Sequence, residues 1–365
     1  MIRSSLCLAL LLFGCSSNPP ATSNAEAPDG GGDAAAADAG YCRSLAADPT
    51  CGKLAWATSP TKSRLRNHHF STIVETKSGP FLYVAGGAEG QATLGDVDIA
   101  PLGADGSIGA WTKGPALIQP VGGMTGGVIS NVIVIAGGMG RKVTDLAYSA
   151  VIGDDGSLGA WKAAGSTHQK RMHPGSVVSG ENIYVIGGFN DPNVWDDVVR
   201  ASVSPDGTVS AWTPAGKMPG PRSHFGTALV DGFVYLTGGL DESALGGPPV
   251  LDTVLRATLT PDGTLAEWTE MKKLPVGVAT HANFFFGGYL YVVGGITSAA
   301  HENGVWRAPI NADHTLGTWE DAPKLPTARG HVHQVPILGN RVYSVAGALD
   351  FDLNSTDHID IGTFQ

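Results

Sequence analysis

The chain of 365 residues contains little charge, few cysteines and few cationic side chains. Charged residues make up only 15%, whereas glycine (51) and proline (23) are frequent. This composition argues against long helices and for short strands joined by tight turns. Lys and Arg number 23 against 33 Asp and Glu, so the formal net charge is −10. We therefore expect an all-β protein that lacks the basic surface required of a nucleic-acid partner.

The N-terminus carries the features of an export signal. Arg3 is followed by the apolar stretch "LCLALLLF" at residues 6–13, which is far too short to span a bilayer. The motif "LFGC", ending at Cys15, resembles a bacterial lipoprotein signal, in which the peptide is cut before the cysteine and the cysteine is acylated. We expect residues 1–14 to be this signal, and Cys15 to hold a lipid anchor. A plain secretory signal is the alternative.

Apart from Cys7 in the signal and Cys15, which would carry the lipid, the chain has two cysteines, Cys42 and Cys51. An even pair in an oxidising compartment predicts a disulfide, which would close a lead-in at residues 42–52. Residues 16–40 contain no bulky apolar side chain, so residues 15–41 should form a tether rich in Ala, Gly, Pro and Asp that cannot order itself. Together these features predict an exported protein of the bacterial cell envelope, an outer-membrane lipoprotein facing the periplasm or the surface.

Two signatures recur along the rest of the chain. A nine-residue stretch such as "SPDGTVSAW" occurs five times, and its tryptophans are 50, 51, 56 and 51 residues apart. They are Trp111, Trp161, Trp212, Trp268 and Trp319. An apolar strand ending in a glycine pair, as in "LYVAGG", occurs at six sites, the last of which is Ala346-Gly347. A repeat of this length predicts one structural unit used several times.

Each unit is predicted to contain four strands, the last two joined by an Asp-Gly hairpin turn, with the tryptophan in the fourth strand. Because neighbouring units cover the faces of each unit, we expect the tryptophans and the second strands to form the core. Four strands in about 50 residues are typical of a propeller blade. The last unit lacks its fourth strand, whereas a single strand around Trp56 precedes the first unit. We expect this N-terminal strand to complete the sixth blade and remove an open edge. The fold class is then an all-β, six-bladed propeller of four-stranded blades over residues 53–365.

The glycine pair followed by a tryptophan about 25 residues later resembles the kelch repeat, over essentially the whole of residues 53–365. The sequence departs from that family because aspartate stands where the kelch repeat usually has tyrosine, six residues before each tryptophan. These positions are Asp105, Asp155, Asp206, Asp262 and Asp313. The resemblance implies a kelch-like propeller, a fold that hosts both binding proteins and a sialic acid mutarotase.

Candidate binding residues gather on one rim of the predicted propeller. The connections from the second to the third strand vary in length and sequence, as binding loops on a rigid scaffold do. Candidate contacts on these connections are Asn190, Asp191, Trp195, Asp241, Glu242 and Asp352. The start of the first strand, on the same rim, carries Arg and His two residues apart. This set comprises Arg66 and His68, Arg171 and His173, Arg222 and His224, and Arg329 and His331, with His281 alone in the fifth unit.

The Arg and His set permits two interpretations. Guanidinium groups bind carboxylate or phosphate in a bidentate manner, so the set could form an anion site. The alternative is packing, in which these polar side chains bond the backbone of a neighbouring blade. No spacing typical of a metal site occurs, and we predict neither a metal nor a cofactor.

We expect a monomeric, non-catalytic binding or scaffolding protein that engages a protein or a glycan through the variable loops. The alternative is a carbohydrate-active enzyme of the mutarotase or isomerase type. Such an enzyme needs one acid and one base around a sugar ring. The candidates for these roles are Arg222, His224, Glu242 and His281.

Overall fold

The computed structural model describes residues 53–90, 92–241 and 249–365, which belong to one compact unit, Asp33–Gln365. The expected signal peptide, tether and lead-in therefore lie outside the described residues, as do Cys15, Cys42, Cys51 and Glu242. All regular elements in the described residues are strands. None of these residues forms a helix long and apolar enough to cross a membrane.

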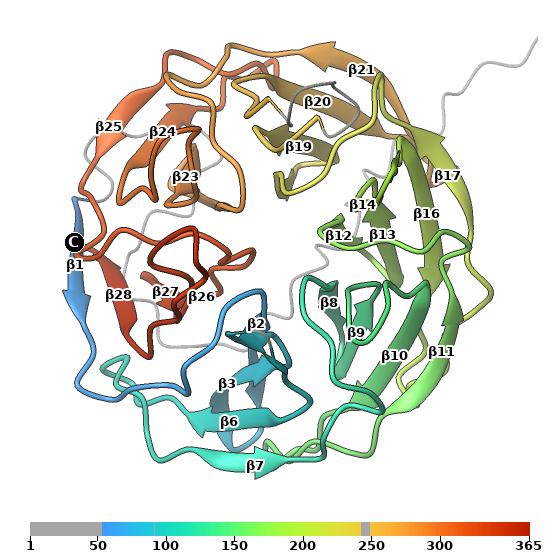
Figure 1. Ribbon diagram of the computed structural model, residues 1–365, viewed down its shortest axis with the longest axis vertical. Coiled ribbons are helices and arrows are strands. Elements are labelled where there is room, and N and C mark those ends of the chain that lie inside the picture. The colour runs from blue at the N-terminus through green and yellow to red at the C-terminus, as the bar shows by residue number, and fades with distance from the viewer. Residues whose placement is uncertain (1–52, 91, 242–248) are drawn as a thin grey trace, which may run out of the picture. The chain divides into compact units, whose positions relative to one another are not determined.

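The strands form four-stranded antiparallel units that follow one another around a common centre (Figure 1). From the innermost strand outwards, the first unit contains β2 (Phe70–Thr76), β3 (Gly79–Ala85), β6 (Val97–Pro101) and β7 (Thr112–Gly114), and the second contains β8 (Thr125–Ile129), β9 (Val132–Ala136), β10 (Leu146–Val151) and β11 (Lys162–Ser166). The third contains β12 (Gly175–Ser179), β13 (Asn182–Ile186), β16 (Asp197–Ser202) and β17 (Thr213–Lys217), and the fourth contains β18 (Gly226–Val230), β19 (Phe233–Thr237), β20 (Val254–Leu259) and β21 (Leu265–Glu270). The next contains β22 (Ala282–Phe286), β23 (Tyr289–Val293), β24 (Val305–Pro309) and β25 (Glu320–Ala322), and the last contains β26 (Ile337–Leu338), β27 (Arg341–Val345), β28 (Ile359–Phe364) and β1 (Leu54–Thr58). The third and fourth units are joined by one parallel pairing, Gly216 with Leu265.

The N-terminal strand lies in the same sheet as the last three strands of the chain. β1 pairs with β28 in an antiparallel register that places Leu54 opposite Phe364 and Thr58 opposite Asp360. Figure 1 shows β1, in blue, beside β28, in red. The indole nitrogen of Trp56 also donates a hydrogen bond to the carbonyl of Pro323, 2.9 Å away in the preceding unit. Residues from the two ends of the described chain therefore share one sheet.

The second strand of each unit is the most deeply buried. All five residues of β9 ("VIVIA") and of β23 ("YLYVV") are buried. A continuous apolar run of this kind is expected where both faces of a strand are covered. Here the neighbouring units cover them, and apolar clusters fill the spaces between units. The expectation that these strands form the core is confirmed.

Backbone hydrogen bonds join each unit to the next at the glycine pairs. In each unit the second glycine donates its N–H to a carbonyl at the start of the following unit. The pairs are Gly87 with Val121 (2.9 Å), Gly138 with Arg171 (2.7 Å), Gly188 with Arg222 (2.9 Å), Gly239 with Val278 (2.8 Å), Gly295 with Arg329 (2.9 Å), and Gly347 with Arg66 (2.9 Å). The second position also requires glycine because of contacts within its own unit. A Cβ on Gly239, whose φ is +97°, would lie 2.5 Å from the Ser223 carbonyl oxygen.

The Asp-Gly turns form hairpins that also bind neighbouring units. Asp105 accepts a hydrogen bond from the Ser107 amide at 3.0 Å, and the other Asp-containing turns repeat this contact. The hydroxyl of Tyr83 donates to the Gly156 carbonyl in the turn of the next unit, at 2.9 Å. His314, which replaces the glycine of the last turn, adopts a φ of 61° and stacks on Phe233 at 4.2 Å.

The tryptophans bind the preceding unit. The indole nitrogen of Trp212 donates to the Ala164 carbonyl at 2.9 Å, and Trp161 and Trp319 make similar bonds. These three are buried, as expected, whereas Trp111 and Trp268 are only partly buried. In most units the fourth strand begins just after the tryptophan, although the sequence analysis placed the tryptophan within it.

Candidate functional site

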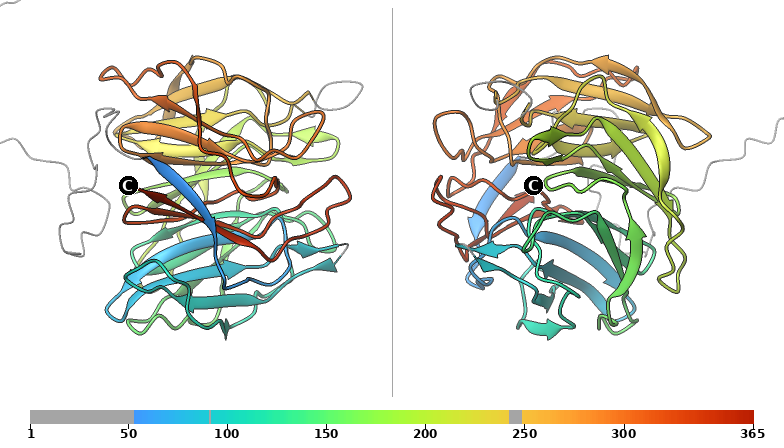
Figure 2. Two further views of the ribbon diagram at one scale, coloured as in Figure 1. Left: turned by 90° about the vertical axis from the view of Figure 1, so that its left-hand side faces the viewer. Right: turned by 45° about the vertical axis from the view of Figure 1, so that its right-hand side comes forward.

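Two sets of connections share one rim of the described structure. In each unit, the segment that leads into the first strand pairs with the connection after the second strand. These bridges are Asn67 with Ala88, Gly122 with Met139, Met172 with Phe189, Ser223 with Leu240, Ala279 with Ile296, and Gly330 with Ala348. We call this rim the loop face. Figure 2 (left) shows that the hairpin of β4 (Ala88–Glu89) and β5 (Ala92–Thr93) extends from the end opposite to the C-terminus.

At the centre of the loop face, equivalent residues of the successive units come together. They are His68, Gly123, His173, His224, Thr280 and His331, and all have φ between 52° and 66°. Five of the six amides donate to the carbonyl of the preceding member: His68 to His331 (3.0 Å), Gly123 to His68 (2.8 Å), His173 to Gly123 (2.7 Å), His224 to His173 (3.1 Å) and Thr280 to His224 (2.8 Å). Left-handed backbone in non-glycine residues is costly and persists only when surrounding structure holds it. This hydrogen-bonded belt supplies that restraint.

The imidazoles of this belt form one cluster, which His333 joins. The ring centroids of His173 and His224 are 3.8 Å apart, and those of His68 and His331 are 4.1 Å apart. His333 lies 5.3 Å from His173. The structure therefore brings together the four belt histidines that the sequence analysis selected. His333 was not among the candidate residues, although it stands only two residues after His331 in the sequence.

The environment of the cluster disfavours the charged form of four of its rings, those of His68, His173, His331 and His333. Burial, followed by the charge of His224, lowers the pKa of His68 from 6.5 to about 3. Burial and then the neighbouring imidazoles lower the pKa values of His173, His331 and His333 well below 6.5. Neutral imidazoles do not attract an anion electrostatically. Among the described residues, no group of three or more His, Cys, Asp or Glu side chains is arranged to hold a metal ion.

The four candidate arginines are buried and already bonded. In each, the guanidinium donates to the carbonyl of the first residue of the glycine pair in its own unit, as Arg171 does to Gly187 at 2.7 Å. The other pairs are Arg66 with Gly86 (2.9 Å), Arg222 with Gly238 (3.0 Å) and Arg329 with Ala346 (3.0 Å). Arg66, Arg171 and Arg329 also bind carboxylates. Arg222 instead donates to the Thr253 hydroxyl at 2.8 Å. The geometry favours packing over an anion site, and the partners lie in the same unit.

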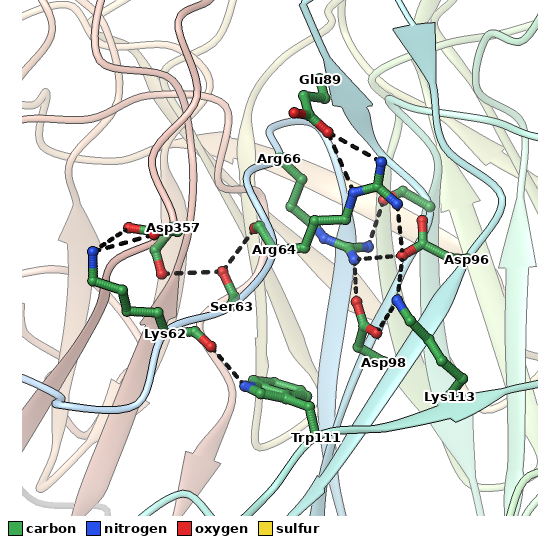
Figure 3. Close-up of polar contacts among 11 residues, drawn as sticks. Lys62, Ser63, Arg64, Arg66, Glu89, Asp96, Asp98, Trp111, Lys113 and Asp357 are labelled. Carbon is green, nitrogen blue, oxygen red and sulfur yellow. Dashed lines mark hydrogen bonds and ion pairs between the residues drawn. The ribbon is translucent and has the colours of Figure 1, made fainter.

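Figure 3 shows one of these arrangements in full. Arg66 donates to Asp96 at 3.1 Å and also contacts Asp98. Lys113 lies 3.0 Å from Asp96, and Arg64 lies 3.3 Å from it. Burial opposes ionisation of Asp96, but the hydrogen bond from Lys113 and the charges of the three cations lower its pKa to about 2. The carboxylates therefore neutralise Arg66, whose side chain is fully buried and not accessible to an external anion.

The sequence analysis placed His281 in the wrong register. Thr280, with a φ of 56°, occupies the belt position of the fifth unit. His281 is one residue further along and buried, with its Nε2 2.7 Å from the Thr237 hydroxyl and accepting from the Gly226 amide at 3.2 Å. Counting 12 residues from Trp268 gives Thr280 directly, so the sequence contained the signal. The error arose because a histidine stood beside the position.

The candidate loop residues lie on the loop face without forming one cluster. Asn190 and Asp191 belong to a small hairpin of β14 (Phe189–Asn190) and β15 (Asn193–Val194). The indole of Trp195 donates to the Lys170 carbonyl at 3.0 Å, so it contributes to packing. Asp352 is exposed, and Asp241 lies just before residues that the structure does not describe.

Aromatic contacts cross the centre of this face. Phe189 lies 5.4 Å from His224 and 5.9 Å from His173. On the far side of the cluster, Phe351 lies 4.9 Å from His301, whose ring is 6.1 Å from His331. A series of ring contacts therefore runs from the β14–β15 hairpin, through the imidazoles, to the connection after β27.

All large apolar side chains exposed in the described residues belong to the loop face. Phe351 is the most exposed of them, at 58%. The set comprises Leu65, Ile118, Met139, Leu146, Leu349 and Phe351. Leu65 and Ile118 lie on connections into a first strand, and Leu146 begins a third strand. The other three lie on connections from a second to a third strand. The sequence analysis selected none of these residues. Exposed apolar side chains gathered on one face are typical of a protein-interaction surface.

No family model matches the chain. It is 25% identical over 197 residues to kelch repeat and BTB domain-containing protein 1 of Ectromelia virus (strain Moscow), which covers 52% of this chain and 31% of that protein. It is 25% identical over 201 residues to alpha-scruin of Limulus polyphemus, covering 54% of this chain and 21% of that protein. The chain thus spans less than a third of the length of these relatives.

A comparison with solved structures agrees with the sequence similarity to kelch-repeat proteins. The structure of YjhT superposes with a TM-score of 0.65 at 14% sequence identity, and the match covers 84% of this chain and 99% of that one. The chain is a diverged kelch-like β-propeller. In this propeller the loop face is one end, the Asp-Gly hairpins form the other, and the His cluster lies at the centre of the first.

The propeller also contains a central cavity of about 230 Å³. Hydroxyl, amide and backbone groups of the innermost strands line it, including those of Thr72, Thr125, Ser176, Thr227, Asn283 and Gln334. The described residues proposed for a mutarotase do not face this cavity as a set. Arg222 and His281 are held in packing contacts, so no arrangement of the described residues favours the enzyme alternative.

Proposed function

We propose that this kelch-like propeller is a non-catalytic protein-binding module and that the loop face is its binding surface. The observation that carries the proposal is the placement of every described large exposed apolar side chain on this one face. Apolar area removed from water provides the main driving force for protein association. A relative named as a kelch repeat and BTB domain-containing protein is consistent with an interaction role for the propeller.

The opposite end of the propeller has a different chemistry. Its hairpin turns present exposed Asp side chains, such as Asp105, Asp155 and Asp206, which bind the amide or hydroxyl of their own turn. Charged side chains are depleted from the centres of protein interfaces. This contrast supports assigning the partner to the loop face.

Two further features complete the proposal. The partner meets the propeller in the bacterial cell envelope, where the lipoprotein-like motif ending at Cys15 would anchor it. The propeller has six blades, and the strand around Trp56 closes the last of them. The pairing of β1 with β28 and the bond from Gly347 to Arg66 support this closure.

Site-specific photocrosslinking in the native host would test the binding surface. A photoreactive amino acid at Phe351 or Met139 should give discrete crosslinked adducts with a partner protein. The same group at Asp105 or Asp206, on the opposite end, should give none. Equal adducts from both ends, or none from the loop face, would contradict the proposal. Globomycin-sensitive processing and labelling with a palmitate analogue, lost on Cys15→Ser, would test the anchor.

A further inference from the structure

One part of the loop face is hollowed into a cleft of about 680 Å³. It lies between the connections that follow β7, β9 and β11, and β5 borders it. Its lining includes Arg141, Lys142, Val143, Leu146 and Lys170, and we call this feature the basic cleft. Its volume is sufficient for several side chains of an extended peptide.

Three cations line the basic cleft: Arg141, Lys142 and Lys170. Among the described residues, none of Arg141, Lys142 and Lys170 forms an ion pair, although all three are exposed. Elsewhere on this face, Lys324 is also without an ion pair among the described residues, whereas three other lysines are neutralised locally. Lys113 binds Asp96 and Asp98, Lys217 binds Asp196, and Lys273 binds Asp252. The one carboxylate lining the cleft, Asp145, accepts a hydrogen bond from Ser166 at 2.5 Å.

Unpaired cations stand out in a protein with a formal net charge of −10. Three positive charges around a concave surface attract a negatively charged group and hold it near the surface. The strength of an ion pair at such a partly enclosed site falls as ionic strength rises. Such a pair contributes more to the specificity of binding than to its affinity.

The cleft is also bordered by half of the exposed apolar set. Leu146 lines it and is 42% exposed, whereas Ile118, at 56%, precedes the lining residues Gln119 and Pro120. Met139, at 44%, forms a backbone bridge with Val143. A simple phosphate or a lipid headgroup would use the charges but leave these side chains exposed to water. A peptide that is both acidic and apolar would use both.

We propose that the basic cleft binds an acidic segment of the partner protein that also carries bulky apolar side chains. This inference rests on the proposed function, because it specifies the chemistry of the partner that the loop face engages. The carboxylates of the segment pair with Arg141, Lys142 and Lys170, and an apolar side chain packs against Leu146.

Fluorescence anisotropy with short labelled peptides tests the inference on the full-length protein. One peptide alternates Asp and Glu with Leu and Phe, a second replaces the acids by Asn and Gln, and a third replaces Leu and Phe by Ala. We expect the first to bind at least about tenfold more tightly than the other two, and its affinity to fall as NaCl is raised. Equal binding of the amide peptide, or no binding of any peptide, would overturn the inference.

Variants locate the binding. Arg141→Glu with Lys142→Glu should weaken binding of the acidic peptide by at least about tenfold, because each change replaces attraction by repulsion. Lys324→Glu, an exposed cation of another unit on the same face, is the matched control and should leave affinity within about twofold. An equal loss in the control, or binding to phosphatidylglycerol vesicles in place of the peptide, would also overturn it.

The two proposals fail separately. If crosslinking at Phe351 captures a partner while the acidic peptide does not bind, the loop face remains the binding surface and the basic cleft is excluded. If the loop face yields no partner, the proposed function itself is excluded, whatever the peptides show.

Discussion

Arg171 and Asp197 form a bidentate pair, with Nη1 donating to Oδ1 at 3.0 Å and Nη2 donating to Oδ2 at 2.7 Å. The guanidinium is fully buried and also donates to the Gly187 carbonyl. One side chain therefore connects the segment before the first strand with the ends of the second and third strands. The arginines of the repeat hold each unit together, which explains why they recur without forming a binding site.

Replacing Arg171 should therefore destabilise the protein. We expect Arg171→Ala to lower the free energy of unfolding by about 3 kcal/mol, because the carboxylate of Asp197 and the Gly187 carbonyl lose their partner. Urea denaturation measures the change. Lys77→Ala, which removes an exposed ion pair with Asp154, is the control and should change stability by less than about 1 kcal/mol. A similar loss in both variants would show that burial of the pair is not the cause.

The imidazole cluster should make the propeller sensitive to acid. His68 has a folded pKa of about 3, below the ordinary 6.5 of an unfolded chain, so below pH 6.5 the unfolded state binds more protons than the folded state. The stabilisation is fully present above pH 6.5 and is lost progressively as the pH falls towards 3. Urea denaturation at several pH values measures it. His68→Asn should flatten the dependence, since Asn tolerates left-handed backbone; an unchanged slope would contradict this.

Gly123 should be intolerant of a side chain because of the cluster. A Cβ there would lie 2.7 Å from the ring of His173, and its φ is +66°. Gly180 has a similar φ of +54° but nothing within 4 Å of its Cβ position. We expect Gly180→Ala to cost about 1–2 kcal/mol from backbone strain alone. Gly123→Ala should cost about 1–3 kcal/mol more, from overpacking. Thermal and urea unfolding measure both losses of stability. If Gly123→Ala and Gly180→Ala lose the same amount, the cluster is loosely packed around Gly123.

The N-terminal strand should be required for a closed sheet. Removing residues 1–58 would leave the edge of β28 unpaired and exposed, which favours aggregation. A peptide of residues 53–60 added in trans should restore a monodisperse protein in size-exclusion chromatography. The same peptide with Leu54→Asp and Trp56→Asp should fail, because Leu54 is buried and the Trp56 indole bonds Pro323. A truncated protein that stays monodisperse without the peptide would argue against closure by this strand.

Much of the architecture was readable from local patterns. The repeated Asp-Gly turns and glycine pairs specify backbone conformations that only a few residue types adopt easily, so their spacing predicted the order of strands. The continuous apolar runs predicted the buried second strands, and β9 and β23 confirm them. The envelope location and the disulfide of Cys42 and Cys51 remain predictions.

The candidate site was less predictable because it depends on contacts between distant residues. Whether Arg66 can bind an external anion is decided by Asp96 and Asp98, which lie 30 and 32 residues further along. Whether His281 belongs to the central cluster is decided by a shift of one residue, which turns a side chain to another surface. Local sequence contains neither piece of information.

By itself, the sequence determined the repeat, the four-stranded unit and the rim on which the variable connections lie, because turns and apolar periodicity act over a few residues. Only the tertiary structure decided which polar side chains neutralise one another and which apolar side chains stay exposed. Ion pairing and burial depend on distances between units that are far apart in the chain. The unpaired Arg141, Lys142 and Lys170 and the exposed Phe351 are therefore visible only in the folded propeller.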